Sequence, residues 1–126
     1  MQVNDIVTDI GRMPGEFRRR GDRSMIQLLE ESGYFSNSAA VTVQRLRDHF
    51  RMHSENLQAW VLHSEDNRSS PSWYIVEPEA ANSGARWTVG YHPGDQRETY
   101  EHGDEACAVY VKRWLEQIGG FVKHAS

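Results

Sequence analysis

The sequence contains little cysteine and no long run of apolar residues. Its one cysteine among 126 residues, Cys107, excludes an internal disulfide. The longest aliphatic or aromatic runs are a few residues, such as 59–62, so no segment is expected to span a membrane. The N-terminal residues lack both the basic start and the apolar core of a secretory signal. These absences predict a cytoplasmic location.

Phosphate-binding glycine patterns are also missing. Gly84, Gly90, Gly94 and Gly103 are scattered at turns and strand positions, and no glycines of the chain form GxGxxG or GxxxxGK[ST]. We therefore expect no nucleotide cofactor, and the sequence indicates no other cofactor.

Charge is unevenly distributed along the chain. Residues 1–53 carry 8 basic and 7 acidic side chains (+1), whereas residues 54–126 carry 6 basic and 11 acidic ones (−5), which together give the net charge of −4. Such a surface repels nucleic-acid phosphates and attracts a basic partner. An ordinary solvated face that keeps the protein in solution explains the same asymmetry.

The length predicts a single domain over residues 1–126, with residues 1–23 as a loosely packed N-terminal helix and loop. Apolar periodicity of 3 to 4 residues predicts helices, and Pro14-Gly15 and Gly119-Gly120 predict the ends of the first and the last. Ser24 and Gln27 have the spacing of a capping box. The predicted helices are 3–13, 24–33, 36 or 38–53 and 103 or 104–118.

Between the third and fourth helices the apolar pattern favours strands. Three of the four predicted strands carry a tryptophan, and Pro93-Gly94 suits a type II turn before the fourth. The predicted strands are 57–64, 72–77, 86–92 and 96–101. Consecutive strands with short links pair as a meander. The predicted fold is α+β: a four-stranded antiparallel meander sheet packed against two or three N-terminal helices and one C-terminal helix.

Candidate catalytic and metal-binding groups are few. His49 and His53 share a helix face, as zinc ligands can, but no third ligand is indicated, so we expect no metal site. His92 and His102, with nearby glutamates, could converge at the end of the second hairpin as a general acid or base. Cys107 lies on an apolar helix stripe and is predicted to be a core residue. We expect no catalytic residue.

Two basic segments suggest other functions. Arg18-Arg19-Arg20 and Arg23 could bind a phosphate or an acidic partner, or simply form a solvated loop. Arg45, Arg47 and Arg51 lie on a helix that could serve as the recognition helix of a winged-helix DNA-binding protein.

The chain resembles the immunity proteins of bacterial polymorphic and contact-dependent growth inhibition toxin systems. Most of residues 24–118 take part in the resemblance: early helices ending in LLEESGYF, the segments AWVLH, SWYIVEPE, RWTVGYH and QRETYEHG, and a final helix DEACAVYVKRWLEQI. The resemblance implies a protein that neutralises a cognate toxin, for example a basic nuclease, by covering its active site or an essential surface. It implies no catalytic residues, no nucleic-acid or membrane partner, and a monomer or weak homodimer.

Acidic residues on the strand ends and links, with two tyrosines as anchors, are the candidate partner-binding residues, because complementary charge speeds association with a basic toxin. They are Glu65, Asp66, Glu77, Glu79, Tyr91, Asp95, Glu98, Tyr100 and Glu101. A secretion chaperone, a winged-helix protein and a small histidine-dependent enzyme remain as alternatives.

Overall fold

The computed structural model describes residues 2–66, 72–78, 86–94 and 96–125, except the side chains of residues 66 and 121–125. Its elements are α1 (Val3–Arg20), α2 (Met25–Ser32), η1 (Tyr34–Ser36), η2 (Ser38–Ala40), α3 (Val43–Met52), α4 (Ser54–Asp66), β1 (Ser72–Val76), β2 (Trp87–His92), β3 (Arg97–Tyr100) and α5 (Gly103–Ala125). The α+β class is confirmed. The four-stranded sheet is wrong, since the described residues form three antiparallel strands in the order β1-β2-β3.

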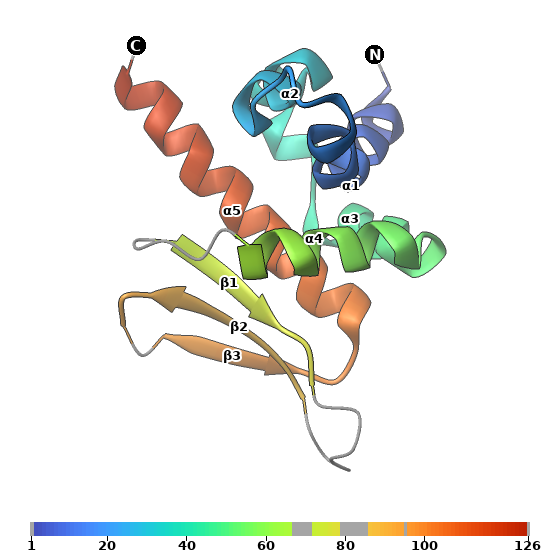
Figure 1. The fold of residues 1–126 in the computed structure, drawn as a ribbon, viewed down its shortest axis with the longest axis vertical. Coiled ribbons are helices and arrows are strands. Elements are labelled where there is room, and N and C mark those ends of the chain that lie inside the picture. The colour runs from blue at the N-terminus through green and yellow to red at the C-terminus, as the bar shows by residue number, and fades with distance from the viewer. Residues whose placement is uncertain (1, 67–71, 79–85, 95, 126) are drawn as a thin grey trace.

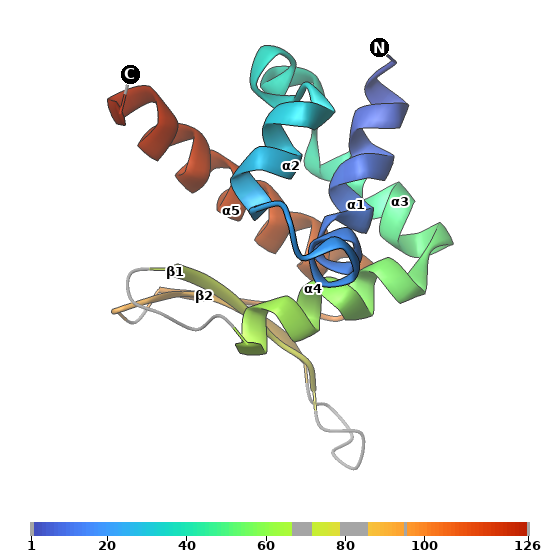
Figure 2. The ribbon, with the colours of Figure 1, turned by 45° about the horizontal axis from the view of Figure 1, so that its top comes forward.

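All the helices lie on one side of the sheet (Figure 1). Helix α5 contacts all three strands and α4 contacts β1, while α1, α2 and α3 pack farther from the sheet. Figure 2 views the sheet nearly along its plane and shows its other face free of helices. The protein is therefore a helical layer with a small sheet beneath it.

The predicted strand 57–64 is wrong, because these residues belong to helix α4. Leu57, Trp60, Val61 and Ser64 are all buried, and they recur at steps of 3 or 4 residues. That spacing puts them on one helical face. Packing of this face outweighs the preference of tryptophan and valine for strands.

Pro14 does not end α1, which continues to Arg20. A proline inside a helix has no N–H to give to the carbonyl four residues earlier, here that of Ile10. The indole Nε1 of Trp60 donates to this carbonyl at 3.1 Å, so the acceptor has a partner from another helix. The loop expected over 14–23 is accordingly limited to the residues after Arg20.

Helix α1 is also tightly packed, and the loosely packed N-terminal helix was a wrong expectation. Ile6 and Ile10 are 0% exposed, and Val7 and Met13 are buried beside them. The helix ends at Gly21, whose φ of 70° is the left-handed conformation common at helix ends.

The capping box of α2 is confirmed: Ser24 accepts from the Gln27 amide, and the Gln27 side chain accepts from the Ser24 amide. The helix predicted from residue 36 or 38 begins later than expected. Two 3-10 turns, η1 and η2, come first, and α3 begins after Thr42, whose side chain accepts from the Arg45 amide. The threonine cap, rather than the apolar stripe, sets the start of α3.

Gly119-Gly120 does not end α5, which runs to Ala125. Neither glycine has a positive φ, in contrast to Gly21 and Gly33, which end α1 and α2. The predicted type II turn at Pro93-Gly94 is also wrong, since Gly94 has φ 144°, far from the value of about 80° that this turn requires.

The core lies between the helices and the inner face of the sheet. The prediction that Cys107 is a core residue is confirmed, and Tyr110, Val111 and Trp60 are buried too. Trp73, Trp87 and Trp114 are partly buried and pack against this core. Among the described residues, no helix is both long and apolar enough to cross a membrane.

Candidate partner-binding surface

Strand register decides which predicted residues come together. Trp87 pairs with Tyr100 and Val89 with Glu98, while Trp73 of β1 pairs with Tyr91 of β2. Side chains at alternate positions share a face, so all of these lie on the face that α5 covers. Three of the predicted partner-binding residues, Tyr91, Glu98 and Tyr100, therefore lie on one face of the sheet.

Arg113 of α5 links these side chains into one cluster. Its Nη2 binds Glu98 Oε1 at 2.6 Å, and its guanidinium lies over the Trp73 ring, 4.7 Å from the centroid. The Trp73 and Tyr91 rings are 5.1 Å apart, and the Tyr100 hydroxyl donates to the other oxygen of Glu98. The cluster of Trp73, Tyr91, Glu98, Tyr100 and Arg113 is called the hairpin cluster below.

Charge in the hairpin cluster is fixed by these contacts. Hydrogen bonds from Tyr100 and then from Arg113 lower the pKa of Glu98, so its carboxylate stays ionised. Burial, followed by the hydrogen bond to Glu98, raises the pKa of Tyr100 to about 12. At neutral pH the Glu98 carboxylate is therefore ionised, and the phenol of Tyr100 that donates to it is neutral.

Glu101 lies just past β3 on the opposite face. It binds Arg86 Nη2 at 2.7 Å through Oε1, and its side chain is 68% exposed. Asp104, at the start of α5, binds Arg51 at 3.0 Å and approaches Arg47 at 3.6 Å. Burial alone would raise the pKa of Asp104. The hydrogen bonds from Arg51 and the Glu105 amide, together with the charges of Arg47 and Arg51, outweigh this effect, so the pKa is lowered. Glu101 and Asp104 are therefore both partly neutralised by arginines of the same chain.

The remaining predicted residues do not join the hairpin cluster. Glu65 is exposed on the last turn of α4, and Glu77 is exposed just after β1. The side chain of Asp66, and Glu79 and Asp95 as a whole, lie outside the described residues. The sequence prediction also missed Arg113 and Trp73, which complete the cluster. Arg113 lies within the predicted last helix, but the spacing of apolar and polar residues there does not indicate that its side chain contacts the sheet.

The two edge strands of the sheet, β1 and β3, differ in whether their outward backbone groups have hydrogen-bond partners. The Tyr91 amide donates to the Gln96 carbonyl at 3.1 Å, so Tyr91 and Gln96 form a hydrogen-bonded pair. By the antiparallel alternation, the N–H and C=O groups of Arg97 and Thr99 then point away from β2. On β1 the same alternation points those of Ile75 outward, where Ser64 of α4 binds both: its Oγ accepts from Ile75 N at 3.0 Å and donates to Ile75 O at 3.4 Å. The β1 edge is closed there, while β3 is open.

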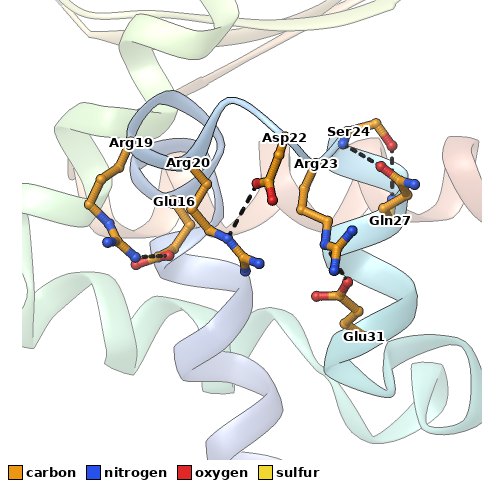
Figure 3. Close-up of polar contacts among 8 residues, drawn as sticks. All are labelled: Glu16, Arg19, Arg20, Asp22, Arg23, Ser24, Gln27 and Glu31. Atoms are coloured by element: carbon orange, nitrogen blue, oxygen red, sulfur yellow. Dashed lines mark hydrogen bonds and ion pairs between the residues drawn. The ribbon is translucent and has the colours of Figure 1, made fainter.

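The arginines at the α1–α2 junction form ion pairs with acidic side chains of the same chain (Figure 3). Arg19 binds Glu16 at 2.6 Å, Arg23 binds Glu31 at 2.8 Å, and Arg20 lies 3.6 Å from Asp22. Arg18 has an interaction of its own. Because the arginines are neutralised within the chain, this cluster is poorly suited to hold a phosphate.

The winged-helix arrangement does not fit the structure. Helix α3 packs against α5 and α1, and α4 separates it from the strands that would form the wing. Arg47 and Arg51 face Asp104, while Arg45 donates to the Asn4 side chain at 3.1 Å. A recognition helix needs such side chains free to reach base edges.

The histidine pairs lie apart from the hairpin cluster. His92 ends β2 and His102 follows β3, so they lie at opposite ends of the antiparallel pair. The expected convergence of His92 and His102 is therefore wrong. The His49 and His53 rings lie 4.6 Å apart, and Asn56 Nδ2 is 3.0 Å from His49 Nε2. No three histidine, cysteine or acidic side chains of the described residues are grouped to hold a metal ion.

Comparison of the chain with protein-family models, curated proteins and solved structures finds no match.

Proposed function

We propose that this protein binds and neutralises a cognate bacterial toxin domain, as an immunity protein does, through the surface around the β2–β3 hairpin. The observation that carries the proposal is the hairpin cluster. Two tyrosines and an ionised glutamate expected to contact a partner lie together: Arg113 binds Glu98 and lies over Trp73, which in turn contact Tyr100 and Tyr91. A surface ordered before binding loses less conformational entropy when a partner arrives.

The charge of the chain supports a basic partner. The net charge is −4, and Glu65, Glu77 and Glu101 are exposed at or near the sheet. The pairing of Glu101 with Arg86 is weak, because both side chains are exposed to solvent, so Glu101 is only partly neutralised. A nuclease toxin is basic where it holds phosphates, so it would associate faster with such a surface.

We expect a toxin gene beside the gene of this protein, and the test is a calorimetric titration of the intact chain against that gene's product at several salt concentrations. We expect binding that weakens with salt and that falls on reversing Glu98 and Glu101. Glu30→Arg, at an exposed position of α2, is the control and changes the charge as much as either single reversal does. Flat salt dependence, or an equal loss in the control, would contradict the role of this surface. Absence of binding to the neighbouring toxin would contradict the function itself.

A further inference from the structure

Strand β3 offers an unpaired edge. It is the outermost strand of the sheet, and no helix extends past it (Figure 1). Among the described residues, the N–H and C=O groups of Arg97 and Thr99 that point away from β2 take part in no backbone hydrogen bond. An exposed edge of this kind is a template for pairing with another strand.

The sequence of this edge is complementary to itself. Residues 97–101 read Arg-Glu-Thr-Tyr-Glu. When two copies run antiparallel with Thr99 opposite Thr99, Arg97 of each copy faces Glu101 of the other. Opposite charges and paired threonines across strands are both stabilising. Glu98 then faces Tyr100 of the other copy, so no two like charges are opposed.

Other registers of the same edge are worse. The outward-pointing residues must pair with each other, so the register shifts only in steps of two. One shift places Glu98 opposite Glu98, a further one places Arg97 opposite Arg97, and like charges directly opposite destabilise a pair. A shift the other way places Tyr100 opposite Tyr100 and leaves Arg97 without an acidic partner. Of these registers, the one centred on Thr99 pairs Arg97 with Glu101 and opposes no like charges.

We propose that two copies of this protein associate through β3, centred on Thr99, to form one continuous six-stranded sheet with a two-fold axis. The occupant is a second copy rather than an unrelated segment, because Arg97 and Glu101 of one copy then face Glu101 and Arg97 of the other. Glu101 then lies between Arg86 of its own chain and Arg97 of the other. This inference goes beyond the proposed function, since it involves no toxin.

The dimer is weak, since β3 has four residues and such a contact buries less than the roughly 1,200 Å² of a stable interface. The test is sedimentation equilibrium of the full chain up to about 1 mM. We expect reversible dimerisation in that range. Arg97→Glu and Glu101→Arg should each raise the dissociation constant at least about tenfold, since each opposes like charges twice. Thr99→Pro should do the same by removing an outward N–H.

A mixture of the two charge-reversed variants tests the proposed pairing most directly. In an equimolar mixture of Arg97→Glu and Glu101→Arg chains, both charged pairs are opposite again, so heterodimers should form where neither variant dimerises alone. Glu30→Arg is the control and should dimerise like the unaltered chain. A monomer at 1 mM overturns the proposal. So does a dimer that survives all three edge variants, or a mixture that stays monomeric. None of these outcomes bears on toxin binding.

Discussion

The indole N–H of Trp60 takes the place of the N–H that Pro14 lacks, by donating to the carbonyl of Ile10. The contact joins α1 to α4 at a point where both are buried. It lets α1 contain a proline without leaving a buried acceptor unsatisfied, a defect that costs about 1–3 kcal/mol.

Trp60→Phe should therefore lower the free energy of unfolding by at least about 1–3 kcal/mol, because it leaves the Ile10 carbonyl without a donor. Chemical denaturation measures the change. Trp87→Phe is the control, since the Trp87 indole N–H makes no hydrogen bond with the described residues. Adding Pro14→Ala restores a backbone donor, so Trp60→Phe should cost less in that background. Equal costs in both backgrounds would contradict the link.

Ser64→Ala should destabilise the protein by about 1–3 kcal/mol, because it leaves the N–H and the C=O of Ile75 without partners in a buried position. The exposed Ser36 supplies the control, and Ser36→Ala should change little. Amide hydrogen exchange of Ile75 gives a local readout. It should accelerate in the Ser64 variant more than the global loss of stability explains, and unchanged exchange would rule out this edge contact.

Two glycines of α1 should respond in opposite ways to alanine. A Cβ at Gly11 would lie 2.2 Å from His49 Nε2, whereas a Cβ at Gly15 would have nothing within 4 Å. Gly15→Ala should stabilise the helix by about 0.5–1 kcal/mol. Gly11→Ala should destabilise the protein by about 1–3 kcal/mol, the range of an overpacked site. Thermal or chemical unfolding distinguishes the two, and His49→Ala should relieve Gly11→Ala. Stabilisation by both alanines would disprove the close contact.

Stability should fall as the pH drops below about 6.5. Burial, then the charges of His53, which follows α3, and of Arg12 in α1, lower the pKa of His49, while Glu55 of α4 opposes the shift. In the unfolded chain His49 takes up a proton near its ordinary value of 6.5, but the folded protein takes it up only at lower pH. Stability present above 6.5 is therefore lost as the pH falls.

Unfolding measured from pH 8 to about 5 should show this loss, and His49→Gln should remove most of it. The window lies above the range where Glu98 and Asp104 are protonated, since the pKa of each is lowered. Identical pH profiles for the variant and the unaltered chain would show that His49 is not responsible.

Local signals predicted the helices better than their ends. The capping box at Ser24 and the left-handed Gly33 were readable in the sequence, because both act through neighbouring residues. Pro14 was misread because the donor that replaces its N–H comes from Trp60, far along the chain. Residues 57–64 were misread as a strand, although the steps from Leu57 to Trp60, Val61 and Ser64 are helical.

The candidate site was predicted in part. Tyr91, Glu98 and Tyr100 could be grouped from the alternation of two neighbouring strands. Arg113 could not, because its approach to Glu98 depends on how α5 crosses the sheet. The pairing of Asp104 with Arg51 likewise depends on the packing of α3 against α5, which no local pattern encodes.

Because Cys107 is buried, its reaction with a thiol reagent can report local unfolding around α5. The side chain is 0% exposed, and burial raises the pKa of its thiol well above the ordinary value, so the thiolate that attacks reagents is scarce while the fold is intact. Because Cys107 is the one cysteine in the sequence, every labelling event reports the same position on α5. The rate at which a thiol reagent modifies the native protein therefore measures how often α5 and the sheet separate enough to expose Cys107.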